Sequence, residues 1–137
     1  MELDKQPILL CLDLEEGSGM LAMQAAGYSL RCNQPLHVLH VITRGRVEKE
    51  ETAMERLKRL VDKSIPDVIV KAVVIRHGLP EDSIIEYIKE TGASPVVLGR
   101  RSHKREHIYV GSTTSAVIST ASVPVLVIPL DGKHKKT

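Results

Sequence analysis

The chain has 137 residues, of which 42% are hydrophobic, which is enough to build a buried core. Its 19 Lys and Arg residues nearly balance its 17 Asp and Glu residues, which excludes a strongly basic nucleic-acid-binding protein and an acidic disordered chain. Aromatic residues make up 2% and all are Tyr, so a stacking platform for single-stranded nucleic acid is also excluded.

The cysteines and the N-terminal residues indicate a compartment. Cys11 and Cys32 are the two cysteines, and their wide separation is typical of reduced thiols in an intracellular protein. The first apolar run, residues 8–12, stops at Asp13 and is too short for a signal-peptide core or a membrane span. We therefore expect a soluble, cytoplasmic protein that does not contact a membrane.

Five short aliphatic runs predict strands. They span residues 8–12, 36–42, 68–75, 96–98 and 125–128. Most are continuous rather than alternating and are rich in β-branched residues, as expected for strands covered on both faces. Proline stands just before or at the start of four of them, where its missing N–H does little harm.

The segments between these runs are predicted as helices. They span about residues 18–31, 47–63, 80–91 and 112–120. Ser18 is placed to cap the first helix. Pro80 suits the first turn of the third helix, and Gly92 suits its end. The apolar face of the second helix is predicted to consist of Met54, Leu57 and Val61.

Strands and helices thus alternate, with successive strands about 30 residues apart, which is the spacing of crossover units. This pattern predicts a three-layer, doubly wound α/β fold with one parallel sheet and helices on both faces. No linker interrupts the pattern, so residues 1–137 are expected to form a single domain, with the basic residues 131–137 as a mobile tail. Ligands of such folds bind outside the carboxyl ends of the strands.

The segment that follows the fourth strand carries three features suited to an anion. Gly99 would let backbone approach a ligand closely, and Gly111 with the following hydroxyls would begin a helix at its positive end. The cations between the two glycines are Arg100, Arg101, Lys104 and Arg105. Together these features favour a phosphorylated ligand. The alternative is that Gly99 only ends a strand, Ser112 caps a helix and the cations are solvated.

Asp13 ends the first strand, where a carboxylate could accept hydrogen bonds from a ribose or a base, or hold a metal ion through a water molecule. Alone, it also fits a solvated acid before a helix start. The following segment, residues 17–22, matches the dinucleotide pattern GxGxxA, but Glu15 and Glu16 before it would repel a pyrophosphate. We interpret it as a turn and helix start.

No catalytic machinery is recognisable. His103 and His107 have the i, i+4 spacing of metal ligands, but no Cys or third His lies near them in the sequence. The chain has no GxSxG nucleophile elbow and no GxxxxGK[ST] phosphate loop. A small α/β enzyme that uses His103 or His107 as an acid or base is therefore a minor alternative.

Taken together, the sequence resembles the universal stress protein family over essentially its whole length. The matching segments are residues 8–13, Leu39-His40-Val41, His77-Gly78-Leu79-Pro80, Val96-Val97-Leu98-Gly99, Gly111-Ser112 and Val123-Pro124-Val125-Leu126-Val127. The resemblance implies the adenine nucleotide alpha hydrolase-like fold, with a five-stranded parallel sheet of order 3-2-1-4-5. It also implies a homodimer formed near the last strand.

The nucleotide-binding branch of that family carries the motif G-x2-G-x9-G-[ST]. Here Gly99 and Gly111-Ser112 match, but Ser102 replaces the second glycine and eight residues separate it from Gly111. The resemblance implies that Asp13 contacts ribose and that the backbone of Val41 contacts adenine. It further implies that Leu98 and Gly99 flank the nucleotide, and that the phosphates meet Arg101, Ser102, Gly111, Ser112 and Thr113.

The expected function is therefore that of a universal stress protein that binds ATP or a related adenine nucleotide as a regulatory ligand in the stress response. Mg²⁺ or Mn²⁺ bridging the phosphates is implied by the same resemblance, and ATP hydrolysis would at most be slow. The alternative is that Ser102 and the shortened loop have abolished nucleotide binding. The protein would then act as a dimeric interaction module.

Overall fold

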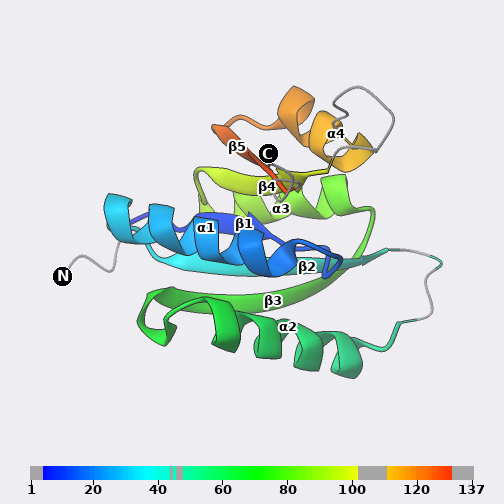
Figure 1. Ribbon diagram of the computed structural model, residues 1–137. Coiled ribbons are helices and arrows are strands. Elements are labelled where there is room, and N and C mark those ends of the chain that lie inside the picture. The colour runs from blue at the N-terminus through cyan, green and yellow to red at the C-terminus, as the bar shows by residue number, and fades with distance from the viewer. Residues whose placement is uncertain (1–4, 44, 46–47, 102–110, 131–137) are drawn as a thin grey trace, which may run out of the picture.

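Parallel pairing joins five strands into one sheet in the order β3-β2-β1-β4-β5 (Figure 1). The computed structural model describes residues 5–43, 45, 48–101 and 111–130. The elements are β1 (Ile8–Cys11), α1 (Ser18–Cys32), β2 (Leu36–Thr43), α2 (Glu50–Ser64), the 3₁₀ turn η1 (Asp67–Ile69), β3 (Val70–Gly78), α3 (Pro80–Thr91), β4 (Val96–Arg100), α4 (Ser112–Thr120) and β5 (Val125–Pro129). The predicted fold class and strand order are confirmed.

The direction of winding reverses at β1, the central strand. On one edge β1 pairs with β2, with Ile8 opposite Leu36, and on the other it pairs with β4, with Leu9 opposite Val96. In an open parallel sheet, the crevice outside the carboxyl ends of two strands at such a reversal is where ligands bind. The ends of β1 and β4 are therefore the place to look for a site.

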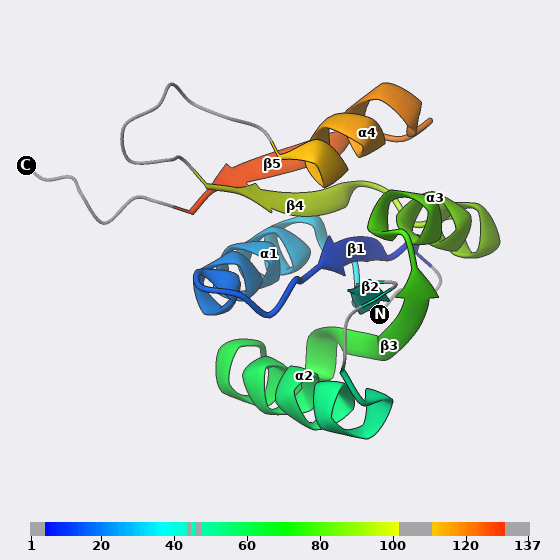
Figure 2. The ribbon, with the colours of Figure 1, turned by 90° about the vertical axis from the view of Figure 1, so that its right-hand side faces the viewer.

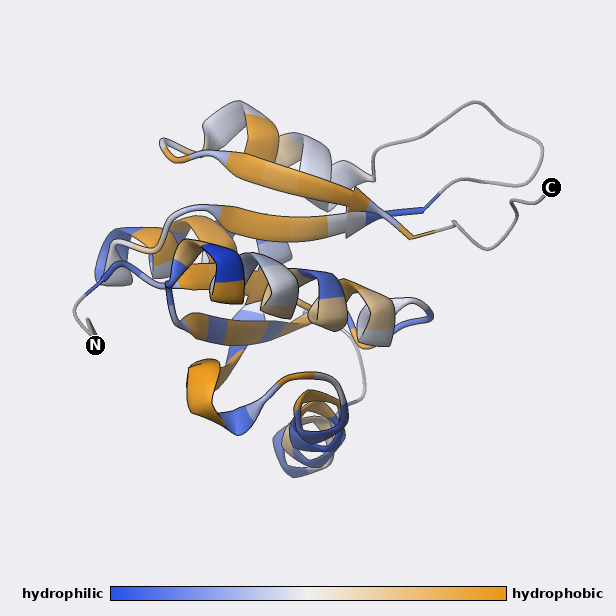
Figure 3. Ribbon diagram, turned by 60° about the vertical axis from the view of Figure 1, so that its left-hand side comes forward, coloured by the Kyte–Doolittle hydropathy of each residue, from blue (hydrophilic) through white to orange (hydrophobic). Residues whose placement is uncertain are grey.

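Helices cover both faces of the sheet, with α1 and α2 on one side and α3 and α4 on the other (Figure 2). Side chains that alternate along the strands fill the two cores: Leu10 and Val38 pack with Leu57 of α2, whereas Leu9 and Leu39 pack toward α3 and α4. The strands are accordingly the most hydrophobic segments, and the outer face of α2 is hydrophilic (Figure 3). None of the helices in the described ranges is long and apolar enough to cross a membrane.

Two predicted element starts are wrong. Residues 68 and 69 were expected in the third strand, but they form η1, because the Ile69 amide donates to the Pro66 carbonyl at 3.2 Å. Val68 is consequently 84% exposed instead of buried in the sheet. The second helix was expected from residue 47, which lies outside the described residues, but it begins at Glu50 because Lys49 is extended.

Other predicted details are corrected or confirmed at the helix ends. Ser18 does not cap α1: the N-cap is Gly17, with a left-handed φ of 94°, and the Ser18 hydroxyl instead donates to Asp13 at 3.3 Å. Gly92 ends α3 in the left-handed conformation, as predicted. In α2 the buried side chains are those of Ala53, Leu57 and Val61, so Ala53 rather than Met54 completes the apolar face.

Candidate ligand pocket

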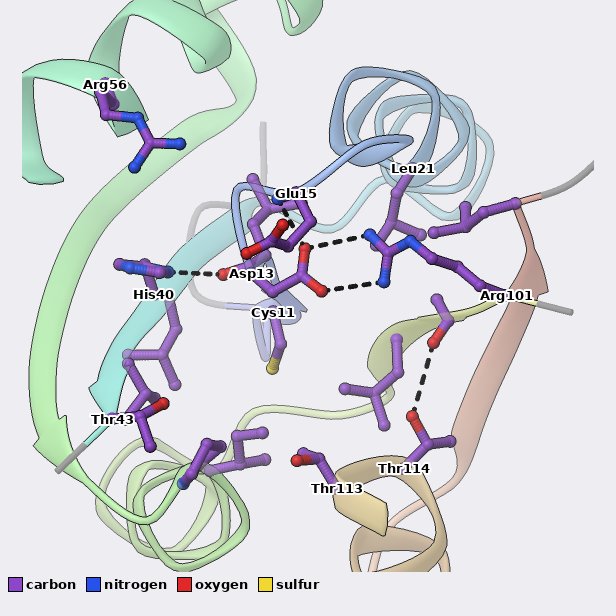
Figure 4. A pocket seen from close by; sticks show the side chains of 18 of the residues that line it. Cys11, Asp13, Glu15, Leu21, His40, Thr43, Arg56, Arg101, Thr113 and Thr114 are labelled. Atoms are coloured by element: carbon purple, nitrogen blue, oxygen red, sulfur yellow. Dashed lines mark hydrogen bonds and ion pairs between the residues drawn. The ribbon is translucent and has the colours of Figure 1, made fainter. Parts of the chain in front are cut away.

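A pocket of about 320 Å³ opens at the carboxyl edge of the sheet, over the ends of β1, β2 and β4 (Figure 4). This volume is in the range of small-molecule sites. Of the predicted site residues, six line it: Asp13, Val41, Leu98, Gly99, Arg101 and Thr113. Gly111 and Ser112 begin the helix that carries Thr113 but are not among the lining residues. Ser102 lies outside the described residues, as do His103, His107, most of the basic loop and the basic tail.

Asp13 and Arg101 lie side by side among the residues that line the pocket and are joined directly by hydrogen bonds (Figure 4). The Arg101 guanidinium donates from Nη1 to Asp13 Oδ2 at 2.9 Å and from Nη2 to Asp13 Oδ1 at 3.1 Å. Its Nε and Nη2 also donate to the carbonyl oxygen of Glu16, at 3.0 and 2.6 Å. Arg101 thereby ties the end of β4 to the turn that precedes α1.

The environment of Asp13 favours its ionised form. Burial raises its pKa, but hydrogen bonds from Arg101 and the Glu15 amide lower it more, together with the positive charge of Arg101. Ser18 adds a weaker hydrogen bond. The pKa of the Asp13 carboxyl is therefore held below its ordinary value, so that the group carries a full negative charge at neutral pH.

Gly99 leaves space that another side chain fills. A Cβ atom on residue 99 would lie 2.5 Å from Leu130 Cδ1 and 3.2 Å from Leu21 Cδ2. Leu130 follows β5 and is held there by its amide, which donates to the Arg100 carbonyl at 2.9 Å. The absence of a side chain at Gly99 thus lets Leu130 and Leu21 pack into the wall of the pocket.

The N-terminus of α4 lies beside the pocket. Its first intrahelical hydrogen bond runs from the Ser115 amide to the Gly111 carbonyl at 2.9 Å, and within the described part of the chain no side chain caps the N-terminus at Gly111. Amides that precede the first such bond have no partner inside a helix and attract anions. Thr114 donates to the Gly99 carbonyl at 3.4 Å, which holds this helix start against β4.

Sequence reasoning missed a second polar group on the α2 side of the pocket. His40 is 5% exposed, and its Nδ1 donates to the Leu12 carbonyl at 2.8 Å. Its Nε2 lacks a hydrogen-bond partner among the described residues and lies 3.7 Å from Glu48, which also lies 3.5 Å from Arg56. His37, three residues earlier on the same strand, forms a hydrogen bond with Tyr87 of α3 at 2.8 Å. The alternation of side chains along a strand was the signal that could have separated the two histidines.

Cys11 forms part of the apolar floor of the pocket, next to Leu98 and Val41. Burial raises the pKa of its thiol well above the ordinary value, so it is a neutral, unreactive group at physiological pH. Both Cys11 and Cys32 are free cysteines. The floor of the pocket is therefore suited to the face of a flat apolar group rather than to nucleophilic chemistry.

No three His, Cys, Asp or Glu side chains in residues 5–43, 45, 48–101 and 111–130 are grouped so that they could hold a metal ion. The side chains of this part of the chain therefore do not fit a metal bound by the protein alone. A divalent cation at this pocket would need phosphate oxygens of a ligand as its main ligands.

A doubly wound parallel sheet with a polar pocket at the point where its strand order reverses places this chain in the class of open α/β proteins, in which this edge is the usual position of a ligand site. Within that class the chain belongs to the universal stress protein family, whose family model matches residues 5–129. The family predicted from the sequence is thereby confirmed.

One relative is a universal stress protein of Synechocystis, which is 30% identical over 105 residues. The match covers 74% of this chain but only 34% of the relative, so the chain spans about a third of that protein's length. Two solved structures share the fold. A universal stress protein in complex with cAMP has a TM-score of 0.72 at 18% identity, with 92% of this chain and 98% of that chain covered. The universal stress protein of Archaeoglobus fulgidus in complex with dAMP has a TM-score of 0.68 at 24% identity, with 90% and 98% covered.

Proposed function

We propose that this chain binds ATP or a related adenine nucleotide as a regulatory ligand in the stress response. The observation that carries the proposal is the convergence of Asp13, Val41 and Thr113 on one pocket at the reversal point of the sheet. These residues come from the ends of β1 and β2 and the start of α4, and a nucleotide needs partners for its ribose, base and phosphates. The complexes of family structures with cAMP and dAMP support the same ligand class.

In this proposal the base lies against the apolar floor, which includes Val41, Leu98 and Ile84. The ribose lies over Asp13, the charged group nearest the middle of the edge. The phosphates extend toward Thr113 and the open amides of α4, where the helix dipole favours negative charge. Mg²⁺ or Mn²⁺ would be held by the nucleotide rather than by a cluster of described side chains, and it would neutralise part of the phosphate charge. Hydrolysis would be at most slow.

A second candidate function is that of an interaction module that has lost nucleotide binding. Two observations favour it: Arg101 already forms hydrogen bonds with both carboxylate oxygens of Asp13, and Leu130 fills the space on the Cβ side of Gly99. In either case we propose a cytoplasmic, single-domain protein that forms a homodimer through β5. Its position at the edge of the sheet leaves one side available for pairing.

Calorimetric titration of the purified protein with ATP, with and without MgCl₂, distinguishes the two functions. We expect saturable heat at one site per chain and an increase in melting temperature. A thermal shift follows because a ligand that binds only the folded state stabilises it. The absence of both heat and thermal shift at millimolar ATP would overturn nucleotide binding and leave the interaction module.

A further inference from the structure

The hydrogen bonds that the Asp13 carboxylate already accepts determine how many ribose hydroxyl groups it can bind. Its Oδ1 accepts from the Glu15 amide at 2.9 Å, from the Ser18 hydroxyl at 3.3 Å and from Arg101 Nη2 at 3.1 Å. Its Oδ2 accepts from Arg101 Nη1 at 2.9 Å. A carboxylate offers about four lone-pair positions, two on each oxygen. Among the residues that the structure describes, the three donors on Oδ1 already exceed its two lone-pair positions, whereas Oδ2 has one donor and therefore one acceptor position left.

Arg101 is held too firmly for one hydroxyl to replace it. Its guanidinium makes four contacts, two with Asp13 and two with the Glu16 carbonyl. Charged, bidentate contacts of this kind are among the stronger hydrogen bonds. If a second ribose hydroxyl displaced Arg101 from Asp13, one hydrogen bond to the hydroxyl would form, but the guanidinium would lose its two hydrogen bonds to the carboxylate. This replacement is therefore unfavourable.

We propose that Asp13 accepts at most one of the two ribose hydroxyls, so that the site does not require both of them. This inference rests on the nucleotide site proposed above and adds a specificity to it. Arg101 then acts as a specificity-determining residue, because its hydrogen bonds to Asp13 use acceptor positions that the two neighbouring ribose hydroxyls would both need. A nucleotide that lacks one hydroxyl loses no contact with Asp13, provided that the remaining hydroxyl is the one that reaches Oδ2.

The test compares the affinities of ATP, 2′-deoxy-ATP and 3′-deoxy-ATP by calorimetry. At least one of the two deoxynucleotides is expected to bind within about threefold of ATP, because it retains every contact that Asp13 can make. Weakening of both deoxynucleotides by more than threefold would overturn the inference while leaving nucleotide binding intact. If none of the three binds, the proposed function fails and the inference fails with it.

Two variants test whether Arg101 is the residue that makes the site tolerate the loss of one ribose hydroxyl. In Arg101→Gln, Oδ2 regains both acceptor positions, so both deoxynucleotides are expected to bind about tenfold more weakly than ATP. The matched control is Arg76→Gln, which removes another bidentate arginine–carboxylate pair, with Glu90 on α3, and is expected to keep the wild-type pattern. Circular dichroism verifies that both variants are folded. An unchanged pattern in Arg101→Gln would overturn the role of Arg101.

Discussion

The side chain of Leu130 fills the space that a Cβ atom on Gly99 would need. The same leucine lies 3.3 Å from the Cβ position of Gly17, whose left-handed backbone starts α1. One side chain at the end of the sheet therefore packs against strand β4 and against the turn before α1, which are far apart in sequence. The resemblance to nucleotide-binding relatives implies that the ligand approaches Gly99, whereas in this structure Leu130 packs there.

Replacing Gly99 with Ala is expected to destabilise the fold by about 1–3 kcal/mol, because the added methyl group would overlap Leu130 and press on Leu21. Urea denaturation measures the change in the free energy of unfolding. In a Leu130→Ala background the same substitution is expected to cost at least about 1 kcal/mol less, since the overlapping atoms are gone. If the two substitutions changed the free energy of unfolding additively, the contact between residue 99 and Leu130 would be contradicted.

Replacing Gly111 with Val tests where the phosphates lie. Gly111 has a φ of −58° and its Cβ position has no atom of the described residues within 4 Å, so the fold is expected to lose less than about 1 kcal/mol. The branched side chain would nevertheless cover the open amides of α4, and ATP affinity measured by calorimetry is expected to fall at least about tenfold.

The control for that experiment is Gly27→Val in α1. Gly27 also has open space around its Cβ position and is not among the residues that line the pocket, so ATP affinity is expected to stay unchanged. Unchanged ATP affinity in the Gly111→Val variant would mean that the phosphates do not approach the start of α4.

The Asp13–Arg101 pair predicts a pH dependence of stability. The pKa of Asp13 is lowered in the folded protein, so the pair stabilises the fold fully above the unfolded pKa of about 3.9 and loses its effect as pH falls through the folded value. Asp13 and Arg101 are 52% and 40% exposed, so Arg101→Gln is expected to cost no more than about 1 kcal/mol at pH 7. Urea denaturation from pH 7 to pH 3 should show that the difference in the free energy of unfolding between the wild type and Arg101→Gln shrinks below about pH 4. A difference that stays constant with pH would contradict a stabilising ion pair between Asp13 and Arg101.

The two cysteines are expected to react at very different rates. Cys11 is half-buried and its pKa is raised by desolvation, whereas Cys32 is exposed at the end of α1. Because the thiolate is the reactive form, iodoacetamide at pH 8 should modify Cys32 at least about tenfold faster than Cys11, as followed by peptide mass spectrometry. In urea the two rates should converge. Equal rates in the folded protein would show that the pocket floor is open to the reagent.

Most of the fold could be predicted because the signals were local. Buried parallel strands need continuous aliphatic runs, and Pro80 and Gly92 mark the ends of α3 through their own backbone preferences. The errors arose where local signals compete. Val68 and Ile69 have β-branched side chains, but the turn after Pro66 continues through them as η1.

The pocket was predicted less completely, because its contacts join distant residues. Asp13 and Arg101 are 88 positions apart, and sequence gives no sign that their side chains are bonded to each other rather than to a ligand. Leu130 and Glu48 line the same pocket, yet a leucine after a strand and a glutamate before a helix carry no pattern of their own. Asp13 and Thr113 were found because each stands at the end of a strand or the start of a helix.

The central position of β1 has a consequence for synthesis of the chain. On the ribosome, β1 can pair with β2 as soon as residue 43 has emerged, but its other edge has no partner until Val96 and Val97 of β4 are made. Through that interval a growing chain exposes a hydrophobic strand edge, the kind of surface on which nascent proteins aggregate. The same strand that places Asp13 at the pocket is thus expected to be left with one unpaired edge until β4 has been made.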